Sequence, residues 1–412
     1  MALWSDRVEK KLAPEVAEFL RAPDRALLPY DCAASKQHAK RLHGAGLLTD
    51  EELAQISEAL DRIAREGGAI DSDEDVHSAI ERLLGDLGRK IHAGRSRNDQ
   101  VVAAMRLYVL DACEEASEGI RRLASVLLDR AEAEAETLIP GYTHMQRAQP
   151  VTLGHHLLAW VEMLERDLVR FVAAATSSKP SPLGAGALAG STLPLPAPDE
   201  QLRNSLDAVA DRDFALDYLY AVAACFSHLS RVAMELCLWA SAEYGFLRLP
   251  EEAATGSSMM PQKLNPDVAE LVRGKAGTAA GRLAGLLAVL KGLPLAYNTD
   301  LQEDKQAVFS ARRDLRGALA ALAVLVHHAE LERERMAEAV ADPLLLATDA
   351  AEKLVGEGVP FRDAYGEVAR SVKDGSFVPP SSAAESVHAR SAPGPGGVKE
   401  AIAAAKSRLS LE

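Results

Sequence analysis

Polar residues gather in the stretch TGSSMMPQKLNPD (255–267), in a chain that is otherwise rich in Leu, Ala, Val, Glu and Arg. Within it, Ser257 offers a hydroxyl and Lys263 a cation. The stretch closes with Asn265-Pro266-Asp267, which has the form of a helix start: Asn as the N-cap, Pro in the first turn and Asp beside the positive end of the helix dipole. Because such a helix end favours negative charge, the stretch is either a solvated connector or an anion-binding loop.

A second polar cluster, HAGRSRNDQ (92–100), precedes the first long helical segment. Arg95, Arg97 and Asn98 place two cations and an amide close together. An ordinary charged surface is one interpretation. In a chain with a formal charge of −14, however, it is one of the few compact groups of cations, and it suits a ligand that carries carboxylates.

Two further polar stretches lie between long helical segments. GYTHMQRAQP (141–150) contains Thr143 and His144, and a histidine can act as an acid or a base near neutral pH. A structural role in a turn is the alternative for that histidine. The other stretch, YNTDLQEDK (297–305), is either a polar inter-helix loop or a source of binding groups from Tyr297, Gln302 and Lys305.

The elements that position these clusters are long helices. Apolar residues recur in steps of three and four after residue 100, and strand-like alternation is almost absent. We therefore predict an all-α fold with polar clusters at helix junctions. The periodicity predicts five long helices, at 101–137, 152–176, 211–245, 266–291 and 302–340, and shorter ones near 31–46, 50–66 and 398–409.

The length and composition are typical of a globular chain of a few domains. Its 412 residues are 48% hydrophobic and 26% charged, which is ample for a core. The negative net charge argues against non-specific binding to nucleic acid. A Pro- and Gly-rich segment, 178–200, is expected to be a long loop. We predict three helical domains: an N-terminal domain over 1–100, a central long-helix bundle over 101–340 and a small C-terminal domain over 341–412.

Helices of this length need long partners to bury their apolar stripes, so we expect oligomerisation through them. Gly277, Gly281 and Gly285 recur every four positions in the helix from 266. Three such glycines cost about 1 kcal/mol each relative to alanine, which favours a groove for a neighbouring backbone over mere tolerance. Clusters at opposite ends of one bundle would then meet at boundaries between antiparallel subunits.

We expect the chain to reside in the cytoplasm and not in a membrane. Its first residues, MALWSDRVEKKL, lack the apolar core of a signal peptide. The longest clean apolar run, 318–326, is shorter than the roughly 20 residues that span a bilayer. No CxxC pair occurs, and we expect free thiols in a reducing compartment at all four cysteines: Cys32, Cys113, Cys225 and Cys237.

Metal-site patterns are weak. Glu74/His77 and Glu385/His388 have the E-x-x-H spacing that di-iron bundles use, but such sites need these pairs on central helices, and both pairs lie in terminal segments. The adjacent His155-His156 face different directions on a helix. The sequence contains no HExxH, Walker loop or GxSxG. We therefore expect no metal site.

Taken in order, these stretches resemble argininosuccinate lyase, a family within the fumarase/aspartase superfamily. GSSMMPQKLNP is similar to a signature that several lyases of the superfamily share. HAGRSRNDQ, GYTHMQRAQP and KGLPLAYNTDLQEDK together are similar to argininosuccinate lyase specifically, as are DEDVHSAIE (73–81) and YDCAASKQHAKRLHGAGLLT (30–49). The resemblance covers residues 1–370, and beyond them only the Pro/Gly break and the last helix.

This resemblance implies an all-α homotetramer with a 20-helix core, to which each subunit contributes its five long helices. It implies active sites assembled from three subunits, with no metal and no organic cofactor. The implied reaction is the reversible elimination of N-(L-arginino)succinate to L-arginine and fumarate, the last step of arginine biosynthesis and a urea-cycle type of reaction.

The resemblance also implies roles for individual residues. Ser257 matches the family's catalytic serine on a mobile loop, His144 its catalytic histidine, and Glu270 the carboxylate that orients that histidine. Lys263 and Asn265 match residues that hold the succinyl carboxylates. The remaining matches are substrate-binding positions, at Ser35, Asn98, Thr143, Tyr297, Gln302 and Lys305.

These residue types suit the elimination. It removes a proton from carbon beside a carboxylate through a dianionic aci-carboxylate, which donors such as Lys263 and Asn265 stabilise. A serine becomes a base only as an alkoxide in a positive environment closed away from water. We favour Ser257 as the base at the succinyl Cβ and His144 as the acid at the leaving guanidino nitrogen, directly or through water. The reversed assignment stays open.

The sequence departs from the family in two places. The usual WGGRF near the N-terminus is here Trp4-Ser5-Asp6-Arg7-Val8, and the third domain is short. One alternative function is a sister lyase for adenylosuccinate, aspartate or fumarate, which HAGRSRNDQ and LQEDK disfavour. A non-catalytic, crystallin-like protein is the other alternative, which the loss of Ser257 or His144 would favour. Both residues are present.

Overall fold

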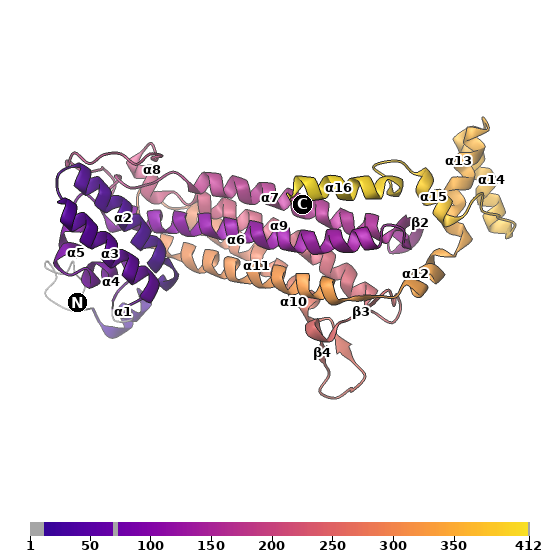
Figure 1. Ribbon diagram of the computed structural model, residues 1–412, viewed down its shortest axis with the longest axis horizontal. Helices are drawn as coiled ribbons and strands as arrows, with labels where there is room; N and C mark the ends of the chain where they lie inside the picture. Colours follow the sequence, from indigo (N-terminus) through magenta and orange to yellow (C-terminus); the bar gives the residue numbers. More distant parts are fainter. Residues whose placement is uncertain (1–11, 69–72, 411–412) are drawn as a thin grey trace. The chain divides into compact units, whose positions relative to one another are not determined.

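A computed structural model of the chain describes residues 12–68 and 73–410 (Figure 1). The departure at Trp4–Val8 lies outside the described residues. The chain divides into two compact units, each made of three segments. Unit 1 takes its segments from residues up to Ser117, from Val169–Ala224 and from Gly277–Leu315, and unit 2 from Glu118–Leu168, Cys225–Ala276 and the residues from Arg316 onward. The three domains expected from the sequence stay a prediction.

Long helices dominate the chain, as predicted. They form because apolar side chains at helical spacing, such as Val109 and Ile120, are fully buried. The five long helices are α6 (Arg97–Ala133), α7 (Leu153–Ser178), α9 (Asp213–Trp239), α10 (Asp267–Leu290) and α11 (Glu303–His328).

The fifth helix is shorter than the predicted 302–340, and that prediction was wrong at its end. α11 stops at His328, and the chain continues as strand β6 (Glu330–Leu331) and helix α12 (Arg333–Val340). β6 pairs with β3 (Leu247–Arg248) in a two-stranded ladder. That pairing directs the backbone out of the helix although apolar residues continue beyond it.

Short helices make up the N-terminal part of unit 1. α2 packs against α3, and Thr49 and Glu52 form a capping box at the start of α3, so the helices predicted near 31–46 and 50–66 are confirmed. The short elements of the unit are α1 (Pro14–Phe19), η1 (Arg25–Leu27), α2 (Leu28–Gly44), α3 (Asp50–Glu66), α4 (Val76–Leu83), α5 (Asp86–Ile91), α8 (Ser205–Ala210) and η3 (Thr299–Gln302).

Unit 2 adds two small hairpins and the C-terminal helices. α13 (Ala347–Gly356) and α14 (Phe361–Asp374) lie side by side (Figure 1). The last helix, α16 (Val398–Arg408), was predicted, and Arg408 ties it to Glu162 and Glu165 of α7. The remaining elements are β1 (Leu138–Thr143), β2 (Gln146–Thr152), η2 (Glu251–Ala253), β4 (Thr255–Gly256), β5 (Leu264–Asn265), η4 (Pro343–Leu346), α15 (Ala383–Ala389) and η5 (Pro395–Gly397).

Helix α9 is the one described helix that is long and apolar enough to cross a membrane by length and composition. Core helices of globular proteins pass the same test. The helix buries Tyr218, Phe226 and Leu229 inside the protein. We therefore interpret α9 as a core helix.

Candidate active site

The site residues predicted from the sequence fall in both units, and each group is described by itself. Unit 1 contains Ser35, Arg95, Arg97, Asn98, Tyr297, Gln302 and Lys305. Unit 2 contains Thr143, His144, Ser257, Lys263, Asn265 and Glu270.

His144 lies at the tip of a β-hairpin that the sequence analysis missed. β1 and β2 are antiparallel, and their last pair is Thr143 with Gln146, so His144 and Met145 form a two-residue loop. Both loop residues have positive φ, 53° and 61°. This is the sign pattern of a type I′ turn, which usually contains Asn-Gly. A non-glycine residue in that conformation costs roughly 1–3 kcal/mol, and the hairpin therefore holds an exposed imidazole on strained backbone.

Ser257 begins a loop whose base is a second short hairpin. β4 and β5 pair Thr255 with Asn265, and the Thr255 hydroxyl also donates to the Asp267 carboxylate. Inside the loop, the Ser257 Oγ accepts backbone N–H groups from Met259 at 3.3 Å and Met260 at 3.0 Å. Two N–H donors directed at one hydroxyl oxygen stabilise negative charge on it.

Asn265 is not the helix N-cap that the sequence predicted. α10 begins at Asp267, and the Pro266 carbonyl accepts the Glu270 N–H at 3.0 Å. Asn265 lies instead in β5, because its backbone is engaged with Thr255 in the ladder. The expected acidic first turn is present, since Asp267 and Glu270 both lie there.

Glu270 is exposed on α10. Within the described residues of unit 2, no hydrogen bond joins Glu270 to His144 or to Ser257. The orienting role expected for this carboxylate therefore stays a prediction. Lys263 is also exposed, on the loop that Ser257 begins.

In unit 1, Ser35 and Arg95 point inward. The Arg95 guanidinium donates to the Ser35 Oγ at 2.8 Å, and that hydroxyl lies 3.3 Å from a carboxylate oxygen of Asp31. Ser35 and Arg95 are both buried. Burial lowers the pKa of Arg95, while Asp31 opposes that shift. These two residues therefore form internal contacts, and the substrate-binding role expected for them stays a prediction.

Arg97 and Asn98 open helix α6. The N–H of Asn98 points at the Ser96 hydroxyl from 3.3 Å, as in an N-cap. The Arg97 guanidinium donates to the Ser78 hydroxyl at 3.0 Å and lies 3.1 Å from the Asp75 carboxylate. The Asn98 amide donates to the Ala187 carbonyl at 3.1 Å, which ties the long loop after α7 to this helix end.

Tyr297, Gln302 and Lys305 are close in the chain and line the start of α11. Burial raises the pKa of Tyr297, against the opposing effects of Arg212 and Gln302. Lys305 is only 2% exposed, and its Nζ donates to Asp304 at 3.0 Å. The three side chains thus offer a phenol, an amide and an ammonium from one helix start.

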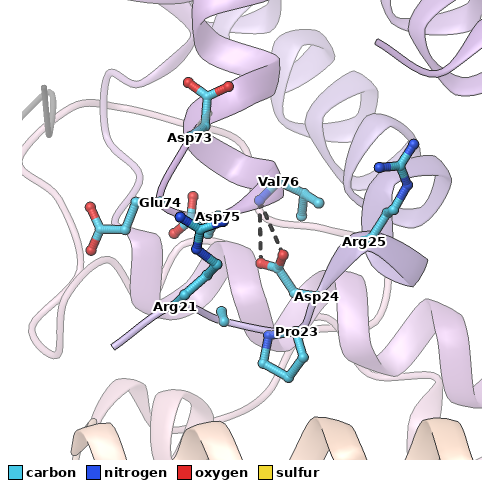
Figure 2. A pocket seen from close by; sticks show the side chains of 9 residues that line it. Arg21, Pro23, Asp24, Arg25, Asp73, Glu74, Asp75 and Val76 are labelled. Carbon is cyan, nitrogen blue, oxygen red and sulfur yellow. Dashed lines mark hydrogen bonds between the residues drawn. The ribbon is translucent and has the colours of Figure 1, made fainter. Parts of the chain in front are cut away.

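A cavity of about 120 Å³ in unit 1 has an acidic lining (Figure 2). The Asp24 carboxylate faces the Val76 N–H at 3.3 Å for both oxygens. Burial and the neighbouring Asp75 raise the pKa of Asp24 to about 7, against the opposing effect of Lys305. Asp24 was not singled out in the sequence, although its partner Val76 lies in DEDVHSAIE. The cavity is lined by Arg21, Ala22, Pro23, Asp24, Arg25, Asp73, Glu74, Asp75 and Val76.

Neither E-x-x-H pair acts as a pair. The His77 Nδ1 bonds to Asp31 at 2.8 Å. Glu385 completes a capping box with Ser382, and His388 pairs with Glu136 at 3.0 Å. Within residues 12–68 and 73–410, no three His, Cys, Asp or Glu side chains gather as a metal-binding group.

Comparison with known proteins identifies the family. A family model described as "Lyase" matches residues 15–281, and one described as "Argininosuccinate lyase C-terminal" matches residues 344–377. Proteins named argininosuccinate lyase from Crocosphaera subtropica and from Synechocystis sp. are each 47% identical, over 391 and 390 residues. The alignments cover 90% of this chain and 84% and 85% of those proteins. The chain belongs to the argininosuccinate lyase family.

Solved structures agree with this membership. An EDDS lyase in complex with formate superposes with a TM-score of 0.81 at 27% identity, covering 98% of this chain and 91% of that one. A class II fumarase from Schistosoma mansoni, at 16% identity and a TM-score of 0.73, shares the fold. This family member is therefore an all-α carbon–nitrogen lyase of the fumarase/aspartase superfamily.

Proposed function

We propose that this enzyme catalyses the reversible elimination of N-(L-arginino)succinate to L-arginine and fumarate. The observation that carries the proposal is the 47% identity to proteins named argininosuccinate lyase over 90% of the chain. The polar clusters add support, because each predicted site residue is of a type that the elimination can use.

In the proposed mechanism, the Ser257 alkoxide removes a proton from the succinyl Cβ. The electron pair forms the new double bond of fumarate, and the bond from carbon to the guanidino nitrogen breaks. His144 supplies the proton that the leaving nitrogen takes up. The two N–H donors on the Ser257 Oγ support the first step, since they favour the charged oxygen.

Charge develops on the succinyl carboxylate as the proton leaves. Lys263 and Asn265, on the loop and at its base, are the groups that we assign to this carboxylate. We assign five further donors to the rest of the substrate: Asn98, Thr143, Tyr297, Gln302 and Lys305. Preorganised donors of this kind contribute most where water is excluded.

We further propose that the enzyme is a homotetramer with composite sites. Leu271 and Leu287 on α10 are 61% and 49% exposed in the single chain, so both side chains are open to contact with a second helix. An added Cβ at Gly277, Gly281 or Gly285 would meet nothing within 4 Å. An apolar surface with a glycine groove suits a second helix at close approach. A cytoplasmic location is part of the proposal, because all four cysteines are free thiols.

The test is direct. Purified full-length protein is mixed with argininosuccinate, and the absorbance of fumarate is followed. We expect fumarate and arginine to appear in equal amounts. Turnover of adenylosuccinate or aspartate in place of argininosuccinate would establish a sister lyase, and absence of turnover with all of them would favour a crystallin-like role.

A further inference from the structure

A buried cluster of three charged residues lies next to the substrate-binding positions of unit 1. Arg212 precedes α9, and Asp304 and Lys305 lie in the first turn of α11. Their exposed fractions are 1%, 0% and 2%. The Arg212 Nε donates to one oxygen of Asp304 at 2.5 Å, and the Lys305 Nζ donates to the other at 3.0 Å. One carboxylate is therefore shared by two cations.

If Arg212 were absent, the negative charge of Asp304 would cancel the positive charge of Lys305. A neutral lysine–aspartate pair has little attraction for an incoming anion, whereas the cluster of three carries a net charge of one positive unit. Burial would raise the pKa of Asp304, but Lys305 and Arg212 hold it below its ordinary value. Asp304 thus stays ionised, and the positive unit depends on Arg212.

The position of Arg212 is fixed independently of Lys305. Its Nη1 donates to the Asp211 carbonyl at 2.9 Å, and its own carbonyl accepts the N–H groups of Ala215 and Leu216 at 3.0 Å at the start of α9. Its Nη2 is buried and has no hydrogen-bond partner among the described residues. A rigid guanidinium in this place fixes Asp304, and Asp304 in turn orients the Lys305 ammonium.

Two acids on neighbouring elements influence the same region. Lys305 lowers the pKa of Asp24 from the value that burial would give, and Arg212 and Asp75 both act on the Tyr297 hydroxyl. Among the described residues, neither Asp24 nor Asp75 hydrogen-bonds to Lys305. Asp304 is therefore the carboxylate that sets the orientation of the lysine.

We propose that Arg212 is a positioning residue of the active site, which acts through Asp304 to orient Lys305 and to keep the cluster positive for a substrate carboxylate. This inference rests on the proposed function, because Lys305 is assigned there to the substrate. Arg212 itself is not expected to touch the substrate. Replacement of Arg212 should therefore weaken substrate binding and change the rate of the chemical step only slightly.

The experiment compares four full-length proteins in the fumarate-release assay: wild type, Arg212→Gln, Asp304→Asn and the double variant Arg212→Gln/Asp304→Asn. Removal of Arg212 alone takes the cluster to zero charge, and we expect KM for argininosuccinate to rise about tenfold or more with a small change in kcat. The double variant returns the cluster to one positive unit through Lys305. Because Lys305 then lacks the carboxylate that orients it, we expect KM of the double variant to lie below that of Arg212→Gln without reaching that of wild type.

A merely structural role for Arg212 predicts a different outcome, because the double variant would then be at least as impaired as the single one. Arg106→Gln is the matched control: Arg106 is also buried, and it pairs with the Asp211 carboxylate and not with Asp304. We expect that variant to lower the melting temperature without raising KM. If Arg212→Gln does not fold, Arg212→Lys and Asp304→Asn take its place. Arg212→Lys keeps the charge of the cluster and should have a KM near that of wild type, whereas Asp304→Asn removes the carboxylate that orients Lys305 and should raise KM.

Two results overturn the proposal. One is a wild-type KM in folded Arg212→Gln, and the other is a double variant that melts like wild type but keeps the raised KM. If the proposed function is wrong, the wild-type protein itself will release no fumarate from argininosuccinate, and this result distinguishes the two failures.

Discussion

The hydroxyl oxygen of Ser257 accepts the backbone N–H of Met260 across 3.0 Å. Met259 contributes a second N–H from 3.3 Å. Both donors come from the same loop, so they accompany the serine wherever the loop moves. A hydroxyl held in this way is easier to deprotonate than a free one, because the alkoxide gains more from the two bonds than the neutral group does.

Replacement of Ser257 by alanine is the first prediction. It removes the proposed base and leaves the β4–β5 ladder intact, so we expect kcat to fall by roughly 10²–10⁴-fold with an unchanged melting temperature. Ser258→Ala is the control, since Ser258 is the exposed neighbour of Ser257 on the same loop. Fumarate release measured under saturating substrate compares them. Equal activity in the two variants would show that the loop has been misassigned.

The second prediction concerns the strained turn at His144 and Met145. Glycine adopts positive φ without a steric penalty, so Met145→Gly should raise the free energy of unfolding by about 1 kcal/mol. Turnover should remain within a few-fold of wild type, because the imidazole is retained. His144→Gly should stabilise the protein by a similar amount and abolish most turnover. Urea unfolding of both variants measures the effect of backbone strain on stability, and the fumarate assay measures the effect on turnover. A loss of stability in Met145→Gly would contradict the assignment of strain to this turn.

The third prediction is a pH dependence of stability that comes from Asp24. Its pKa is about 7 in the folded protein, against 3.8 for an ordinary Asp. The folded state therefore binds more protons than the unfolded state between these values, so the free energy of unfolding falls as pH rises from about 4 to 7 and then levels off. Three pKa units correspond to at most about 4 kcal/mol.

Asp24→Asn removes this titration. The variant should be more stable than wild type at pH 8, and the difference should vanish toward pH 4, as thermal unfolding at several pH values would record. Glu74→Gln is the control, because Glu74 is an exposed acid on the same cavity, and its effect should stay within about 0.5 kcal/mol. A difference between Asp24→Asn and wild type that is independent of pH argues against the assignment.

The fourth prediction tests the glycine groove of α10. In the single chain an added Cβ at Gly281 meets nothing within 4 Å, so Gly281→Leu should leave the fold of one chain unharmed. A leucine would block close approach of a second helix, and light scattering should show smaller assemblies. Gly366→Leu on α14 is the control, since that glycine also has open space around it. A tetramer in both variants would exclude this face from the assembly.

The long helices could be predicted because their buried residues repeat at the helical period, as Val109 and Ile120 do in α6. The ends of the helices were harder to predict from the sequence. The end of α11 depends on strand pairing between Leu331 and Leu247, and no local signal reports a partner so far along the chain.

The hairpin that carries His144 was missed for a local reason. Pro140, Gly141 and Pro150 interrupt its alternation of apolar and polar residues. The signal that was available is the pair Ile139 and Val151, which face each other in the ladder. Residue types identified His144 as a candidate, but only the backbone shows that it lies on a two-residue turn.

Arg212 could not have been found from the sequence. It belongs to no polar cluster, and its carboxylate partner Asp304 lies 92 residues away. By contrast, Lys305 stood in a conspicuous polar stretch. The fold supplies the relationship between them, because it buries both cations against one acid.

The ladder between β4 and β5 has a consequence for limited proteolysis. Both ends of the loop from Ser257 to Lys263 are clamped, by the pairing of Thr255 with Asn265 and by the Thr255–Asp267 hydrogen bond. A single cut in the exposed tip near Met259 would therefore sever the backbone without releasing either fragment. The nicked protein would migrate as two bands on a denaturing gel and as one species on a native gel, with its serine still in place at one end of the break.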